Sequence, residues 1–106
     1  MASSWGILGQ TADASVEATL YTVPASKICK YYVSVTNRST AGTFRLAHVS
    51  GGGATANEDY FAYDEAIDAN ESLTSEIRTG TATDIVRAET STANMTVHIY
   101  GVEADA

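Results

Sequence analysis

Two histidines and one cysteine are the side chains of this chain best suited to acid–base or nucleophilic chemistry. Nucleophilic catalysis needs a serine or cysteine beside a base that an acid orients, and no Gly-x-Ser-x-Gly motif accompanies His48 or His98. Both histidines lie inside segments of alternating character, which indicates ordinary strand positions. Cys29 shares its expected strand face with Tyr31 and Val33, as a small buried apolar residue does. We therefore expect no catalytic residues, no cofactor and no enzymatic activity.

A cluster of acidic residues is the second candidate for chemistry, because carboxylate oxygens are preferred ligands of Ca²⁺. Their spacing matches no EF-hand loop and spreads over two expected turns and a strand. We interpret the cluster as a solvated acidic rim and expect no metal site. The alternative is a calcium site at Asp64, Asp68 and Glu71, in which case EGTA would lower the melting temperature. The cluster consists of Glu58, Asp59, Asp64, Glu65, Asp68, Glu71 and Glu76.

Length, charge and cysteine content limit the number of domains and the kinds of partner that this chain could have. The 106 residues, 44% of them hydrophobic, suit one folded domain. The formal net charge is -7, so the surface repels phosphate backbones and we expect no nucleic-acid partner. Apolar runs such as Trp5–Leu8 are too short to cross a bilayer, and we expect no membrane association. Cys29 is the only cysteine, so the core must hold the fold without an intramolecular disulfide.

Alternation of apolar and polar residues, interrupted by turn residues about every ten positions, predicts an all-β fold. We expect an antiparallel β-sandwich, jelly-roll-like, with seven or eight short strands. Thr79–Asp84 is interpreted as a loop, and Asn57–Ile67 fits a short strand or one helical turn, of which we prefer the strand. The other expected strands are Val16–Val23, Ile28–Thr36, Thr43–Val49, Glu71–Ile77, Ile85–Glu89 and Met95–Val102.

Residues 1–12 read as an N-terminal docking arm that precedes a single sandwich domain of residues 13–106. Trp5, Ile7 and Leu8 are large apolar groups between serine and glycine, and exposure of each costs about 1.5–3 kcal/mol. They should therefore dock on this subunit or on another one. Tyr32 and Tyr100 fall opposite the core positions of their strands, where a tyrosine is either an interface anchor or an ordinary half-covered residue. These five residues are the candidate assembly interface.

Several motifs resemble those of small virion proteins of tailed bacteriophages. Leu20–Lys27 reads Leu-Tyr-Thr-Val-Pro-Ala-Ser-Lys and is similar to the Leu-Tyr-Thr-Val-Pro-Ala-Gly-Lys segment of that group, with Ser26 where glycine is usual. The Asn37–Arg38 turn that follows also matches the group. Ile99–Glu103 resembles its closing strand, and Leu8–Gln10 its lead-in. The motifs are structural and carry no catalytic residues.

The resemblance implies a non-enzymatic structural protein of the phage particle, made in the host cytoplasm. We expect a head decoration (cement) protein on the capsid exterior, in which the apolar arm binds the major capsid protein and three copies form a trimer. The alternative is a tail, baseplate or fibre-associated structural protein that contacts other virion proteins. A third reading, from a different class, is a carbohydrate-binding β-sandwich, which glycan binding by the isolated domain would distinguish.

Overall fold

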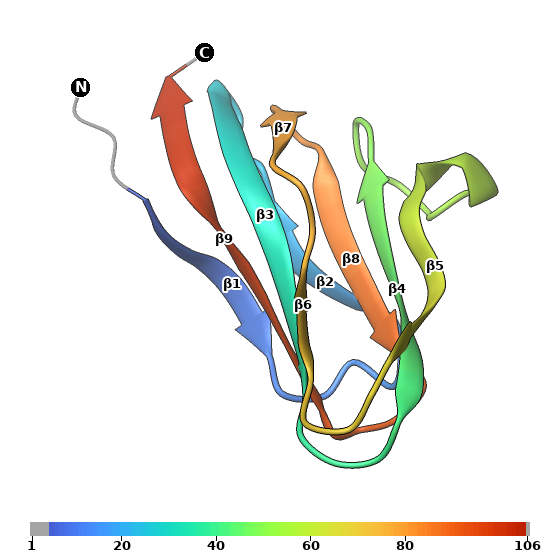
Figure 1. The fold of residues 1–106 in the computed structure, drawn as a ribbon. Coiled ribbons are helices and arrows are strands. Elements are labelled where there is room, and N and C mark those ends of the chain that lie inside the picture. Colours follow the sequence, from blue (N-terminus) through green and yellow to red (C-terminus); the bar gives the residue numbers. More distant parts are fainter. Residues whose placement is uncertain (1–4, 106) are drawn as a thin grey trace.

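Residues 5–105 are described by a computed structural model, in which two antiparallel sheets pack face to face (Figure 1). One sheet has the order β1-β9-β3-β6, with β7 also paired to β3, and the other has the order β2-β8-β4-β5. The predicted all-β sandwich is thus confirmed. The strands are β1 (Gly6–Thr11), β2 (Ala18–Thr22), β3 (Lys27–Asn37), β4 (Gly42–Val49), β5 (Tyr60–Ile67), β6 (Ser72–Thr74), β7 (Arg78–Thr81), β8 (Ile85–Thr90) and β9 (Met95–Asp105), with one 3₁₀ turn, η1 (Asn57–Asp59).

The two long strands β3 and β9 form the centre of the five-stranded sheet and pair along their whole length. Every second residue of β3 points into the sandwich. Tyr31, Val33 and Val35 are therefore buried between the two sheets. Met95, Val97 and Ile99 of β9 are buried in the same way, as the alternation predicted. Phe44 and Leu46 of β4 supply the facing layer of the core.

Part of the expected N-terminal arm is a strand of the sandwich. Gly6–Thr11 forms β1, which pairs with β9 at the edge of the five-stranded sheet. A Cβ atom at Gly9 would lie 2.1 Å from the carbonyl oxygen of Leu20 in β2, so glycine is what lets β1 and β2 come this close. Residues 1–4 of the expected arm lie outside the described residues.

The region between β5 and β8 differs from the sequence-based expectation. The expected strand Glu71–Ile77 is paired only at Ser72–Thr74, and Arg78–Thr81 forms β7 where a loop was expected. With β1 counted as well, residues 5–105 form nine strands rather than the expected seven or eight. Gly80 made the segment look like a turn, but a Cβ there would lie 3.1 Å from the Cys29 sulfur. A larger residue at this position would make tight contacts with Cys29 and Val23, so the glycine helps β7 to pack closely on the core.

The turn after β2 places Ser26 in a left-handed backbone conformation. Lys27 donates its backbone N–H to the Pro24 carbonyl at 3.2 Å, and Ser26 has φ of 65°. A positive φ at the third residue of such a turn is the signature of type II, which favours glycine. Ser26 thus adopts a left-handed conformation that costs an L-residue about 1 kcal/mol.

Candidate functional site

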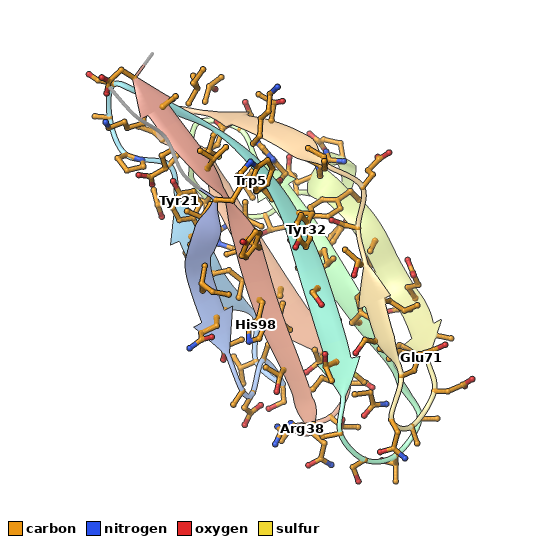
Figure 2. The ribbon with its side chains drawn as sticks, turned by 60° about the vertical axis from the view of Figure 1, so that its left-hand side comes forward. Trp5, Tyr21, Tyr32, Arg38, Glu71 and His98 are labelled. Carbon is orange, nitrogen blue, oxygen red and sulfur yellow. The ribbon has the colours of Figure 1, made fainter. Side chains whose placement is uncertain are left out.

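A row of apolar and aromatic side chains crosses the outer face of the five-stranded sheet. Ile7 of β1 is directly opposite Tyr100 of β9, which is in turn opposite Tyr32 of β3. Register partners point to the same face of a sheet, and the neighbouring residues of β3 and β9 are buried, so this row faces away from the core. Figure 2 shows Tyr32 beside Trp5 above the central strands of this sheet.

Trp5 extends the row at the start of β1. Its ring stacks on Tyr100 with centroids 6.0 Å apart, and the Tyr100 and Tyr32 rings are 5.4 Å apart. Trp5 is 46% exposed and Ile7 53% exposed, which is unusual for such large apolar side chains. We call Trp5, Ile7, Tyr32 and Tyr100 the aromatic face. Four of the five predicted interface residues are thus brought together.

Leu8, the fifth predicted interface residue, does not share this face. The pairing of β1 with β9 shifts register between Ile7 and Gly9, so Leu8 sits at a bulge. Its side chain is half-buried and packs against the hydrophobic core. A bulge depends on how two strands meet, and the sequence of β1 alone carries no signal for it.

The outer face of the five-stranded sheet carries no carboxylate among the described residues, although the chain has 13 acidic residues. Lys30 is the only lysine or arginine on it. Gln10, His98 and Ser34 form the next row on one side of the aromatic face, and Lys30 and Val102 lie on the other side. His98 points outward, as predicted, and lies well below Trp5 in Figure 2.

The outer face of the four-stranded sheet is charged instead. Arg45 of β4 lies between Asp64, whose Oδ1 is 2.6 Å from Arg45 Nε, and Glu89, whose Oε1 is 3.8 Å from Arg45 Nη1. Hydrogen bonding to Asp64 raises the pKa of Arg45 and lowers the pKa of Asp64. The guanidinium also lies 4.2 Å from the centre of the Tyr63 ring. The two outer faces of the sandwich therefore differ sharply in charge.

The acidic cluster does not form a metal site among the residues that the structure describes. Asp64 is engaged by Arg45, and Glu71 Oε1 accepts a hydrogen bond from the Asp68 backbone N–H at 2.9 Å. No group of three or more His, Cys, Asp or Glu able to hold a metal ion occurs between residues 5 and 105. Several members of the cluster instead line the side of the sandwich where β5 and β6 are edge strands.

A buried hydrogen-bond chain, which the sequence analysis missed, joins Tyr31, His48 and Asp84. The Tyr31 hydroxyl is 2.5 Å from His48 Nδ1, and His48 Nε2 is 2.8 Å from Asp84 Oδ2. Because a carboxylate only accepts, His48 Nε2–H donates to Asp84. In the tautomer with its proton on Nε2, His48 Nδ1 accepts from the Tyr31 hydroxyl. The signal in the sequence was that His48 falls on the same face of β4 as Phe44 and Leu46.

Asp84 anchors these buried hydrogen bonds to the backbone. Burial favours its neutral form, but hydrogen bonds from the N–H groups of Thr81 and Gly51 and from His48 outweigh burial and lower its pKa. Burial raises the pKa of Tyr31 to about 12. Tyr31 is fully buried and the His48 side chain is only 12% exposed, so no substrate reaches the pair. The arrangement ties β4 to the β7–β8 turn.

The buried Cys29 and the half-buried Tyr21 are the remaining groups with shifted pKa values inside the sandwich. Cys29 is 2% exposed, and burial raises the pKa of its thiol, which opposes thiolate formation. Tyr21 of β2 donates a hydrogen bond to Glu103 of β9 and so links the two sheets. Burial, with the hydrogen bond to Glu103, raises the pKa of Tyr21. Neither group resembles an activated nucleophile or a general base.

Comparison of the chain with protein-family models, with curated proteins and with solved structures finds no match in any of the three. Within residues 5–105 there is also no helix with the length and apolar character needed to cross a membrane.

Proposed function

We propose that this protein is a non-enzymatic structural protein of a bacteriophage particle, a decoration protein that binds capsid subunits on the head exterior. The observation that carries the proposal is the aromatic face, where Trp5 and Ile7 are about half exposed beside Tyr100 and Tyr32. Tryptophan and tyrosine are typical anchors of protein interfaces. Since about half of each side chain is already covered, burial of the rest of Trp5 and Ile7 against a partner would contribute about 1–1.5 kcal/mol each.

The distribution of charge supports the same orientation on the particle. The outer face of the five-stranded sheet has Lys30 as its only lysine, arginine or carboxylate among the described residues, so an acidic capsid surface would not repel it. The opposite face carries Arg45, Asp64 and Glu89 and is suited to contact with water. We infer that the aromatic face is turned toward the capsid, and that copies associate as a trimer, as the sequence resemblance implies.

The ring geometry favours a protein partner over a sugar. Stacking of a sugar on an aromatic residue needs a free ring face. The rings of Trp5 and Tyr100 stack on each other with an angle of 18° between their planes, and Tyr32 lies tilted against Tyr100. The rings therefore cover part of each other's faces, and the row is better suited to packing against apolar side chains.

The test is reconstitution on heads of the phage that encodes this chain, prepared without it. Wild-type protein should co-sediment with the heads, and Trp5→Ala combined with Ile7→Ser should weaken binding at least about 10-fold, from the burial lost. Val16→Ser is the matched control, because Val16 is 80% exposed but lies outside the aromatic face. Circular dichroism verifies that each variant keeps its β structure.

The outcomes separate the proposal from its alternatives. Hundreds of copies per particle, located on the head by immunogold labelling, would support decoration. A few dozen copies or fewer, located on the tail, would instead mean a tail or baseplate protein. Absence of the chain from purified particles, together with saturable binding to a glycan, would refute a virion role and favour the carbohydrate-binding reading.

A further inference from the structure

A pocket of about 240 Å³ opens between the two sheets on the side where β5 and β6 are edge strands. On the opposite side of the sandwich β1 contacts β2. Phe61 and Ala62 of β5 form one wall of the pocket and Leu73 of β6 forms another. The pocket thus extends from the surface down to the apolar core. The floor consists of the core residues Val33, Val35, Phe44 and Leu46.

Two carboxylates stand at the mouth of this apolar pocket. Glu65 and Glu76 both line it and both are exposed. Glu65 takes part in none of the ion pairs found among residues 5–105, and Glu76 Oε1 is 3.8 Å from Arg78 Nη1. An apolar interior with an anionic rim is complementary to an apolar group that positive charges flank.

A buried donor beside the pocket lacks a partner. Arg78 Nε is buried and has no hydrogen-bond acceptor among the described residues. Its guanidinium lies 4.2 Å from the centre of the Phe61 ring, which lines the pocket. Because this nitrogen is buried, a bound chain does not reach it directly. The Arg78 guanidinium instead packs on the pocket wall and partly balances the charge of Glu76, so Glu65 is the carboxylate at the mouth that no ion pair among residues 5–105 compensates.

We propose that the β5–β6 pocket is a docking site for an extended segment of a partner protein that carries apolar side chains between lysine or arginine residues. The edges of β5 and β6 offer main-chain groups to an extended chain, and the pocket accepts its apolar side chains. Glu65 and Glu76 face the basic flanks. This site is separate from the aromatic face and does not depend on the proposed virion role.

A second copy of this chain does not supply such a segment. With its net charge of -7, a second copy would bring further negative charge to the edge that already carries Glu65 and Glu76, which disfavours self-association at this edge. Lys27 and Lys30 flank the apolar pair Ile28 and Cys29, but they belong to β3, which is paired to β9 along its whole length. The partner is therefore a different and more basic chain.

The probe is a fluorescein-labelled peptide, Lys-Thr-Leu-Thr-Leu-Thr-Lys, whose binding is followed by fluorescence anisotropy. Two control peptides replace both lysines by glutamate or both leucines by serine. We expect saturable binding of the probe and at least about 10-fold weaker binding of each control, since one lacks the charges and the other the apolar groups. Equal binding of the glutamate peptide, or no binding of the probe at millimolar concentration, would overturn the proposal.

Variants of the protein locate the site. Ala62→Leu fills the pocket and should weaken probe binding about 10-fold or more, whereas Ala66→Leu adds the same bulk on β5 outside the pocket lining and should not. If Ala62→Leu disturbs the fold, Glu65→Gln decides, because this exposed substitution should weaken binding several-fold at low salt. Unchanged affinity of both variants would contradict the site. Sedimentation tests the alternative occupant. If the wild type self-associates and Ala62→Leu does not, the pocket binds a second copy, which would refute our choice of partner.

Discussion

Replacement of Asp84 by alanine tests whether the buried hydrogen-bond chain holds the β7–β8 turn in place. The carboxylate accepts hydrogen bonds from His48 Nε2 at 2.8 Å, Gly51 N at 2.9 Å, Thr81 N at 3.0 Å and Thr81 Oγ1 at 3.3 Å. Each bond to a charged acceptor contributes about 1–3 kcal/mol, but bonds within one network are not additive. We expect Asp84→Ala to lower the free energy of unfolding by about 3 kcal/mol.

For a domain of this size, a loss of 3 kcal/mol corresponds to a fall in melting temperature of roughly 12–24 °C. Thermal and urea unfolding followed by circular dichroism measure it. Asp84→Asn should cost less, since its amide oxygen still accepts from Gly51 and His48 can change tautomer toward Tyr31. Asp68→Ala is the control, because the exposed Asp68 side chain makes no hydrogen bond to the described residues, and it should stay within about 0.5 kcal/mol.

The pH dependence of the free energy of unfolding tests the role of Asp84 in a second way. The pKa of Asp84 in the folded protein lies below its usual value. Asp84 therefore binds its proton less readily when folded, and its stabilisation is fully present above the unfolded pKa of about 3.9. It is lost as the pH falls through the folded pKa, so wild type and Asp84→Ala should converge in stability below about pH 4. A difference below 1 kcal/mol at pH 7, or one that stays constant down to pH 3, would refute the argument.

Three further outcomes follow from local geometry. Ser26→Gly should raise the free energy of unfolding by about 0.5–1 kcal/mol, because Ser26 has a positive φ. Urea unfolding measures this change, and a fall in stability would contradict the prediction. Gly9→Ala should destabilise by at least about 2 kcal/mol, because the new Cβ would meet the Leu20 carbonyl oxygen, and an unchanged melting temperature would contradict that contact. Cys29 should react with a thiol reagent such as DTNB only on unfolding, and rapid labelling of the native protein at pH 8 would show that the thiol is not buried.

Alternation along single strands predicted the core well, because a side-chain period of two is a local property of the chain. It identified the buried residues of β3 and β9 and placed Tyr32 and Tyr100 on the opposite face. What it could not provide is register. Only the pairing of β9 with both β1 and β3 brings Ile7, Tyr100 and Tyr32 into one row, and pairing is set by contacts distant in sequence.

The features that the sequence did not predict depend on long-range contacts. Gly9 and Gly80 resemble turn residues locally, yet both lie in strands. The Leu20 carbonyl comes too close for a Cβ at Gly9, and Cys29 and Val23 leave only a tight fit for one at Gly80. His48 and Asp84 are 36 positions apart, and nothing in either segment indicates that they are partners. Asp84 looked like the end of an ordinary loop, although its side chain fixes that loop to the neighbouring strand.

The segregation of charge onto one side of the domain implies that its two proposed attachments would respond differently to ionic strength. Contacts of Trp5 and Ile7 are apolar, and added salt leaves such contacts intact or strengthens them. A basic segment held by Glu65 and Glu76 would be released as the screening length falls to about 10 Å at 0.1 M salt and about 3 Å at 1 M. A simple salt wash would then strip one class of partner from the domain while the other stays bound.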